Sequence, residues 1–269
     1  MRLLTLLLTG TLLLTGCTSF KVDTVEFMDS ITEPSTLKTI DDTETLPFRI
    51  YAPKTFSRFK DDTIPSDEKF PVCIYLHDDT ECGTNNLAQL TNGFDRIVKF
   101  IIDNEEEMIA IAPQCPEGSQ WKDPQMVEHV YELIESLVAK DNVDTSRIYL
   151  TGFGMGGEGV WYFALKYPLA ASAFATVCGG SPASKSSDTV RVPLDLDEAN
   201  IWSISYLDDR IRTSDLAKKI VRSVWVQSVA LTRFTEFPKG GHTPEIYSDE
   251  NFMGWLFSTR KDIKPNFDF

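Results

Sequence analysis

The chain of 269 residues predicts an α/β fold, with a mostly parallel central sheet and helices on both faces. From about residue 70 onward, short apolar runs alternate with segments of helical periodicity. The run at 108–113 is apolar on both faces, as strands inside a parallel sheet are. A hydrophobic content of 42% and a charged content of 25% are ordinary for a globular protein with a sizeable core.

The expected elements follow in order along the chain. Strands are expected at 47–52, 70–77, 108–113, 147–151, 173–178, 201–206 and 231–237. Helices are expected at 94–103, 123–140, 155–166, 213–226 and 251–260. In the first two of these helices the apolar residues recur every three or four positions and form one face. Pro124 suits the first turn of the helix at 123–140.

The N-terminus has the features of an export signal. Arg2 precedes an apolar run at 3–14, which is too short to span a bilayer comfortably. Leu14-Thr15-Gly16-Cys17 resembles a bacterial lipoprotein box, which is cleaved before the cysteine and lipidated on its thiol. The alternative is an ordinary signal peptide in which Cys17 stands by chance.

These features predict three regions. They are a signal peptide at 1–16, a tether and N-terminal strand region at 17–45, and one α/β domain at 46–269. Thr18 is not the aspartate that commonly retains lipoproteins in the inner membrane, so the resemblance implies the outer membrane or the cell surface. The lipid bilayer is then a partner, reached through the anchor.

The net charge of −14 argues against a nucleic-acid partner. Binding to phosphates needs a basic stripe, and none is visible in the sequence. The same charge argues against electrostatic docking on anionic lipid, so membrane attachment would rest on the anchor alone.

Five cysteines are present. Cys73 and Cys178 fall in or at the end of predicted strands and are expected to be buried free thiols. Cys82 and Cys115 both follow predicted strand ends. They are the pair most able to form a disulfide in an exported protein.

The most informative motif lies between the strand at 147–151 and the helix at 155–166. Residues 152–157 read Gly-Phe-Gly-Met-Gly-Gly. A strand, a glycine-rich turn and a helix form the layout of the G-x-S-x-G nucleophile elbow. Here Gly154 stands at the position of the nucleophilic serine. A dinucleotide loop is a poorer interpretation, because the glycine spacing is not G-x-G-x-x-G.

Four blocks of sequence resemble the phospholipase/carboxylesterase-like α/β-hydrolases, including esterases that are often labelled predicted peptidases. The blocks lie at 70–77, 111–121, 144–157 and 234–242. The resemblance implies an α/β-hydrolase fold, no cofactor and a catalytic triad in the chain order Ser, Asp, His. On this basis His242 matches the triad histidine. Asp208 is its expected acid partner, and Asp209 is the adjacent candidate.

The same resemblance assigns the surroundings of the site. Asp78 and Met155 fall on the loops that form the oxyanion hole, with His77 as a structural neighbour. Trp121 is expected near the cleft, where it either stacks on a sugar or aromatic ligand or belongs to the core.

Three departures from the family pattern surround one site. Gly154 replaces the nucleophile, Asp78 stands where the family usually has glycine, and Ile204-Ser205 replaces a His-Gly pair. Losing the nucleophile of a serine hydrolase costs on the order of 10⁶ in kcat. A carboxylate near the oxyanion hole would also repel the charge that the hole must hold.

The sequence therefore favours a nucleophile-deficient pseudoenzyme, a surface lipoprotein that binds an ester, a glycan or a protein in the old cleft. The alternative is an active carboxylesterase-type hydrolase with a relocated nucleophile or a water activated by His242. In that alternative Asp78 or Asp79 would act as nucleophile, or as metal ligand beside Asp208 and His242. No metal is expected, because acidic loops are usually solvated surfaces.

Overall fold

The computed structural model describes residues 35–38, 44–53, 69–140, 143–180, 196, 199–212, 214–225 and 232–261. The expected signal peptide, Cys17 and most of the tether lie outside the described residues and stay predictions. Within the described ranges, no helix is long and apolar enough to cross a membrane.

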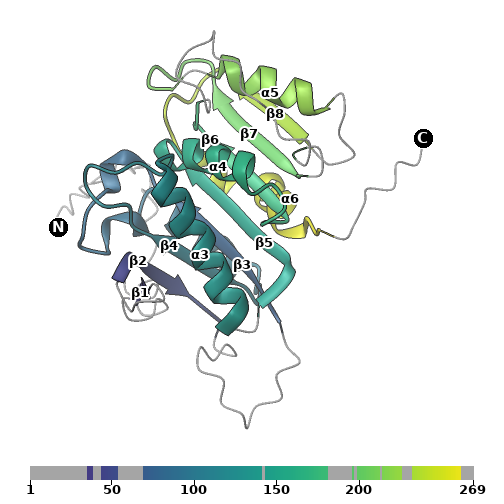
Figure 1. Ribbon diagram of the computed structural model, residues 1–269. Helices are drawn as coiled ribbons and strands as arrows, with labels where there is room; N and C mark the ends of the chain where they lie inside the picture. Colours follow the sequence, from purple (N-terminus) through teal and green to yellow (C-terminus); the bar gives the residue numbers. More distant parts are fainter. Residues whose placement is uncertain are drawn as a thin grey trace, which may run out of the picture.

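Eight strands of the described chain form one sheet, in the order β1-β2-β4-β3-β5-β6-β7-β8 (Figure 1). The pair β1–β2 and the pair β2–β4 are antiparallel, and every other neighbouring pair is parallel. The strands are Ser35–Lys38 (β1), Glu44–Tyr51 (β2), Phe70–Leu76 (β3), Ile109–Pro113 (β4), Val143–Phe153 (β5), Ala173–Val177 (β6), Ile201–Tyr206 (β7) and Thr232–Phe237 (β8).

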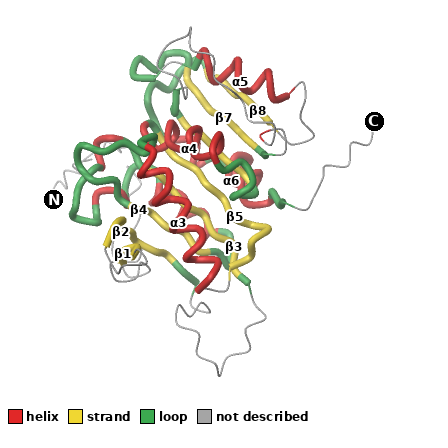
Figure 2. The backbone as a smooth tube through the Cα atoms, in the orientation of Figure 1, coloured by secondary structure: helices red, strands yellow, loops and turns green. Residues whose placement is uncertain are grey.

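The helices lie on both faces of this sheet (Figure 2). They are Phe94–Asp103 (α2), Pro124–Lys140 (α3), Met155–Lys166 (α4), Asp215–Trp225 (α5) and Glu250–Ser258 (α6). The side chains of strand β3 alternate between the two faces of the sheet and pack against both helix layers. Val72 and Ile74 pack into the core with residues of α3, α4 and α5, whereas Cys73 and Tyr75 pack into the core with residues of α2 and α6. The fold class expected from the sequence is thereby confirmed.

The parallel register brings the carboxyl ends of the central strands to one edge. Leu76 of β3 pairs with Gly152 of β5, and Phe153 of β5 pairs with Val177 of β6. The loops that follow β3, β5, β6, β7 and β8 consequently meet there. In open α/β sheets this edge is where ligand sites form.

Two helices, α2 and α4, have the bounds expected from the sequence. The largest difference is in β5, which runs over Val143–Phe153 instead of 147–151. Its extra residues are held by pairing of Phe70 with Val143 at one end and of Phe153 with Val177 at the other. Such partners are distant in sequence, so local periodicity did not reveal them.

Candidate functional site

Gly154 lies in the turn between β5 and α4 and keeps the backbone of a nucleophile elbow. Its φ of 55° and ψ of −115° belong to a region that residues with side chains adopt only under strain. Its N–H donates to the Val177 carbonyl at 2.9 Å. A Cβ on the flanking Gly156 would overlap the Leu76 carbonyl oxygen, so glycine there lets α4 approach β3. The turn after β5 is therefore a tight strand–turn–helix connection with glycine at position 154.

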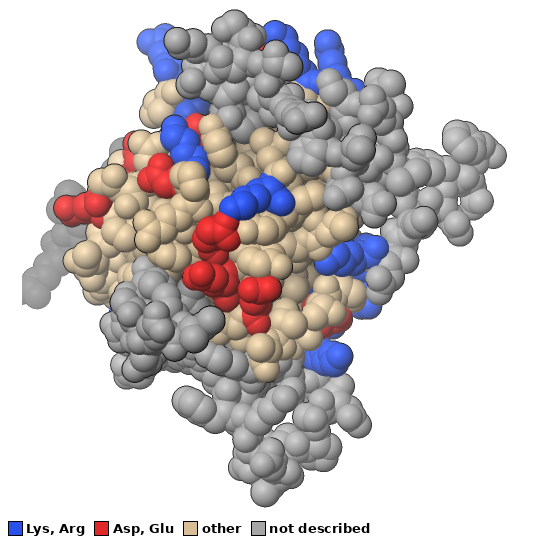
Figure 3. All heavy atoms as spheres, viewed as in Figure 1, with Lys and Arg blue, Asp and Glu red and all other residues tan. Residues whose placement is uncertain are grey.

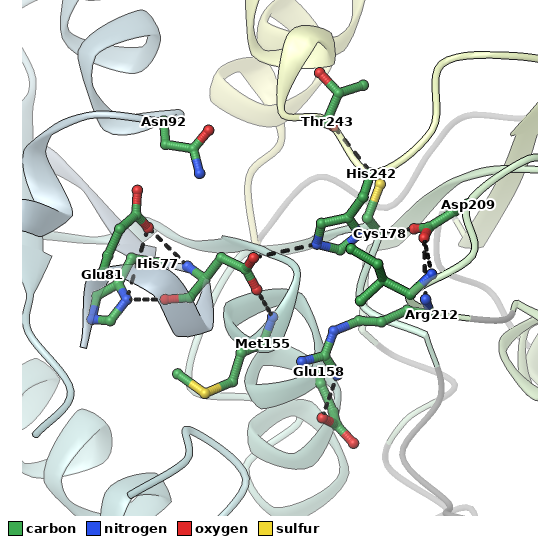
Figure 4. A network of polar contacts seen from close by, with 12 residues as sticks. His77, Glu81, Asn92, Met155, Glu158, Cys178, Asp209, Arg212, His242 and Thr243 are labelled. Carbon is green, nitrogen blue, oxygen red and sulfur yellow. Dashed lines mark hydrogen bonds and ion pairs between the residues drawn. The ribbon is translucent and has the colours of Figure 1, made fainter. Parts of the chain in front are cut away.

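The carboxylate of Asp78 occupies the place that a side chain at position 154 would take. It lies between Met155 and His242, which are labelled in Figure 4. A Cβ built on Gly154 would overlap Oδ1 and Cγ of Asp78 and would lie 2.8 Å from His242 Nε2. Asp78 Oδ1 accepts the Met155 backbone N–H at 2.7 Å. Asp78 Oδ2 lies 3.3 Å from His242 Nε2. Asp78 thus contacts both the histidine and the amide that follows the nucleophile position.

The imidazole of His242 pairs with Asp209. His242 Nδ1 lies 2.9 Å from Asp209 Oδ2. Asp209 Oδ1 accepts the N–H groups of Ile211 at 2.8 Å and Arg212 at 3.1 Å, which fixes the carboxylate in the loop after β7.

The expectation that Asp208 partners His242 is wrong. Asp208 points to solvent and accepts the Gly241 N–H at 2.7 Å, and this hydrogen bond lowers its pKa. The side chain of Asp209 is only 1% exposed and turns inward. Consecutive loop residues point in different directions, and the sequence does not show which of two adjacent aspartates faces the core.

His242 therefore lies between two carboxylates, and this controls its charge. Burial by itself lowers the pKa of His242, but the hydrogen bonds and charges of Asp78 and Asp209 outweigh burial and raise it. Burial likewise raises the pKa of Asp78, but hydrogen bonds from His242 and from the Met155 and Asp79 amides lower it overall. We assign an imidazolium that donates Nδ1–H to Asp209 and Nε2–H to Asp78, on the basis of these contacts.

His77 anchors the loop that carries Asp78. The ring is fully buried; its Nδ1–H donates to the Asp78 carbonyl at 2.6 Å, and its Nε2 accepts the Cys115 N–H at 2.9 Å. Burial lowers the pKa of His77 to about 4, so the ring is neutral. Because both nitrogens bond to the backbone, His77 positions the loop and has no contact with the former nucleophile position.

The expectation that Trp121 binds a ligand is wrong, and the core alternative holds. Trp121 is 1% exposed. Its Nε1–H donates to the His77 carbonyl at 3.0 Å, and its ring packs edge-on against the His77 ring. No face of the indole is left for stacking on a ligand.

Cys82 and Cys115 are free thiols that contact each other through a side-chain hydrogen bond. The sequence identified the right neighbours, but the disulfide is not formed in this structure. Cys73 and Cys178 are buried free thiols, as expected.

Cys178 joins Asp209 and His242 in a group whose ligand atoms lie within 4.8 Å of one another. These residues fit hydrogen bonding better than a metal. Burial raises the pKa of the Cys178 thiol to about 12, and its Sγ faces the Thr243 carbonyl at 3.7 Å. His242 Nδ1 and both oxygens of Asp209 already have hydrogen-bond partners.

Two features around the site were not expected from the sequence. Glu81 is 5% exposed, accepts the Asp78 N–H through Oε2 at 3.0 Å, and has a pKa raised by burial to about 8. Glu158 of α4 accepts Arg212 at 2.7 Å and Lys122 at 3.3 Å, which ties the β7 loop to the helix. The sequence alone does not single out these two glutamates, because their burial is visible only in the structure.

An open groove of about 430 Å³ lies beside the site. It is lined by Asp79, Cys82, Glu117, Gly118, Ser119, Gln120 and Met155. Asp79 and Met155 are the chain neighbours of Asp78 and Gly154, so the groove borders the former nucleophile position. Four of its lining residues, Asp79, Glu117, Ser119 and Gln120, have polar side chains.

No family model and no curated protein matches the sequence. Solved structures do match. A thermostable esterase has a TM-score of 0.71 and 24% identity over 86% of this chain, which spans 64% of that esterase. A ferulic acid esterase has a TM-score of 0.59 and 16% identity, covering 84% of this chain and 97% of its own. An S-formylglutathione hydrolase from Agrobacterium tumefaciens has a TM-score of 0.58 and 16% identity, covering 84% and 94%.

At these identities the likeness concerns the fold. The molecule has the α/β-hydrolase fold in the form found in esterases. At the strand ends that carry the site, Asp78 follows β3 and Gly154 follows β5, and the turn at 152–157 contains no serine.

Proposed function

We propose that this protein is an esterase-like surface lipoprotein that has lost acyl-ester hydrolysis and binds a ligand in the groove beside the former active site. One observation carries the proposal. The Asp78 carboxylate fills the space of the missing nucleophile and binds both Met155 N–H and His242.

Three requirements of acyl transfer fail together. Gly154 supplies no nucleophile, which alone costs on the order of 10⁶ in kcat. The Met155 N–H is occupied by Asp78 Oδ1, and one lost oxyanion donor costs about 2.7–4 kcal/mol in the transition state. His242 Nε2 faces Asp78 Oδ2 at 3.3 Å, and the two carboxylates beside the ring raise its pKa, which favours a protonated ring that cannot accept a proton from an attacking water. A water activated at Gly154 is therefore a poor alternative.

The proposed ligand is hydroxyl-rich, such as a glycan or a sugar ester. The groove supplies side-chain donors and acceptors from Ser119 and Gln120 and acceptors from Asp79 and Glu117. Acidic side chains commonly accept hydroxyl hydrogen bonds, and they disfavour anionic ligands. On the face shown in Figure 3, Lys and Arg side chains are scattered among acidic ones and do not form a basic stripe, which supports a partner other than nucleic acid.

Hydrolysis is tested on the purified protein with p-nitrophenyl acetate and a serine-directed fluorophosphonate, with and without a chelator. We expect no turnover above background, no labelling and no effect of the chelator. Labelling of a serine, or turnover that the chelator abolishes, would contradict the loss of acyl hydrolysis.

Binding is tested by thermal shift against a panel of glycans and sugar esters. A hit in the groove should weaken at least tenfold in Gln120→Ala and stay unchanged in Gln125→Ala, which alters an exposed glutamine of α3. Equal binding by both variants would place the ligand elsewhere.

The anchor rests on the Leu-Thr-Gly-Cys17 motif. Cells expressing the full chain are labelled with a fatty-acid analogue, and Cys17→Ser is the control. We expect label in the wild type only, with the protein in the outer membrane or at the cell surface. A freely secreted, unlabelled wild type would contradict the anchor.

A further inference from the structure

Two free thiols lie in the loops that form the walls of the groove. Cys82 lies in the loop after β3 and Cys115 in the loop after β4, and their side chains form a hydrogen bond with each other. The Gly83 N–H donates to the Cys115 carbonyl at 3.0 Å, so the two backbones are joined directly beside the thiols. A disulfide between these sulfurs therefore needs no large movement of the backbone.

The cysteines differ in their access to solvent. Among the four cysteines of the described ranges, Cys82 alone is partly exposed, and it lines the groove. Cys115 is fully buried, and Cys73 and Cys178 are buried as well. A reagent that enters the groove consequently reaches the sulfur of Cys82 first. Cys115 is then the thiol in position to displace whatever Cys82 has bound.

The pair is connected to both walls of the groove and to the former active site. One wall comes from the loop after β3, and residues 117–120, after β4, form the other. The Cys115 N–H donates to His77 Nε2 at 2.9 Å, and His77 Nδ1–H donates to the Asp78 carbonyl at 2.6 Å. A bond between the two sulfurs would fix the distance between the walls and restrain the loop that carries Asp78.

We propose that Cys82 and Cys115 are a reversible redox pair that links the two walls of the groove when it is oxidised. The oxidant is a disulfide, either a small molecule or a protein, of the kind that acts on exported proteins. This setting rests on the proposed export of the chain, whereas the chemistry of the pair does not. The modification leaves open which ligand the groove binds.

The reaction is a thiol–disulfide exchange in two steps. Cys82 Sγ bonds to one sulfur of the oxidant, the S–S bond of the oxidant breaks, and the departing sulfur takes the proton of the Cys82 thiol. Cys115 Sγ then bonds to Cys82 Sγ, and the second sulfur of the oxidant leaves with the Cys115 proton. The sum is two protein thiols and one disulfide giving the Cys82–Cys115 disulfide and two thiols, so both electrons pass to the oxidant. A dithiol that enters the groove reverses the reaction.

Burial sets the rate of this exchange. It raises the pKa of both thiols, so the reactive thiolate is scarce at neutral pH. Oxidation should therefore become faster as the pH rises from about 7 to about 9.

The test equilibrates the mature chain with mixtures of oxidised and reduced dithiothreitol. Cys17→Ser is introduced so that an unlipidated thiol at that position does not compete. The remaining thiols are alkylated after denaturation and counted by mass spectrometry. We expect two thiols to be lost together, a peptide map that joins Cys82 to Cys115, and full recovery on reduction. A link between any other pair, or both thiols intact in the most oxidising mixture, would overturn the proposal.

The effect on the groove is measured on the oxidised and reduced forms. Oxidation should slow amide hydrogen exchange at least about tenfold in residues 78–83 and 114–120 and raise Tm by about 5–10 °C. Cys82→Ser should abolish both differences, and Cys73→Ala, which keeps the pair, should retain them. If Cys82→Ser does not fold, the peptide map and the exchange of the chain with both cysteines decide.

Unchanged exchange in the oxidised form would show that the pair does not control the groove and would overturn that part of the proposal. These measurements use neither an ester nor a glycan. Turnover of p-nitrophenyl acetate or a lack of glycan binding would contradict the proposed function and would leave the assignment of the redox pair unaffected.

Discussion

The two halves of the site differ in how closely they match the esterase triad that the sequence resembles. The half built from the loops after β7 and β8 keeps a histidine and its acid, with His242 Nδ1 2.9 Å from Asp209. The half built from the loops after β3 and β5, the changed half, departs from that pattern at Asp78 and Gly154. Both halves lie at the carboxyl ends of strands of the same sheet, so their position in the fold does not explain the difference.

Asp78 and Gly154 are sterically coupled. A side chain at position 154 would overlap the Asp78 carboxylate, so a serine there and Asp78 in this rotamer exclude one another. The retained half is bound to the changed half through the contact of His242 with Asp78. Leaving a buried charge without its partner costs free energy, so Asp78 and His242 stabilise each other in the folded protein. Positions 78, 154 and 242 are therefore coupled, and a change at one of them affects the other two.

Replacing both residues of the changed half should produce the largest gain in activity. Gly154→Ser combined with Asp78→Gly should hydrolyse p-nitrophenyl acetate with a kcat/KM roughly 10²–10³ above either single variant, because it supplies the hydroxyl and frees the Met155 N–H. The matched control is Gly154→Ala with Asp78→Gly, which lacks the hydroxyl and should stay inactive. Equal activity in Gly154→Ser alone would show that Asp78 does not block the site.

The mutual exclusion predicts a cost in stability. Gly154→Ser alone should lower the free energy of unfolding by roughly 3 kcal/mol, from overlap with Asp78 and from the strained backbone at φ 55°. Urea unfolding measures it. Gly118→Ser is the control, since Gly118 has φ 80° but no neighbour within 4 Å of a Cβ, and it should cost less. If the two costs are equal, Asp78 does not contact position 154.

The retained half is tested by its acid. Asp209→Asn should lower stability by about 2 kcal/mol, because it weakens a buried charged hydrogen bond to His242. In the activated double variant it should also abolish ester hydrolysis. Asp208→Asn, at an exposed neighbour, should change neither property substantially. The reverse result would restore Asp208 as the acid.

The smallest expected effect is the pH dependence from Glu81, which supports the Asp78 loop. Its folded pKa of about 8 exceeds the unfolded value of about 4.5, so the stability it contributes is present below pH 4.5 and is lost as pH rises through 8. Between pH 6 and pH 8 the loss should be about 1–2 kcal/mol.

Glu81→Gln should remove this part of the slope. The raised pKa of His242 acts in the same direction and should leave a weaker fall above pH 6.5. Unfolding curves at several pH values measure both contributions. An unchanged slope in Glu81→Gln would show that the carboxyl is not held neutral by burial.

Much of the fold could be predicted because its signals are local. Periodicity defined α2 to the residue, and the glycine-rich turn after the predicted strand defined α4 equally well. Apolar runs located β3, β4, β6 and β7 within one residue at either end. The blocks around Gly154 and His242 placed the nucleophile position and the histidine in their loops, and the structure brings them together at the strand ends.

The errors concern the direction of side chains. Asp208 and Asp209 are chemically identical neighbours, and only packing decides that Asp209 faces His242. Trp121 was ambiguous between cleft and core for the same reason, and its hydrogen bond to the His77 carbonyl decides for the core. The sequence predicted that the Asp78 carboxylate would repel negative charge near the oxyanion hole. In the structure, Asp78 Oδ1 accepts a hydrogen bond from the Met155 N–H.

Local patterns in the chain were sufficient to predict the strands, the helices and a glycine-rich turn at Gly154, because these depend on residue type and on spacing along the chain. The tertiary structure was needed to show that the carboxylate of Asp78 fills the space of a side chain at position 154 and that His242 is held between two carboxylates. Positions 78, 154, 209 and 242 come from four loops, and their atoms meet only after the parallel strands align their carboxyl ends. The charge and protonation of a site depend on distances of about 3 Å between such groups, which no local pattern in the chain records.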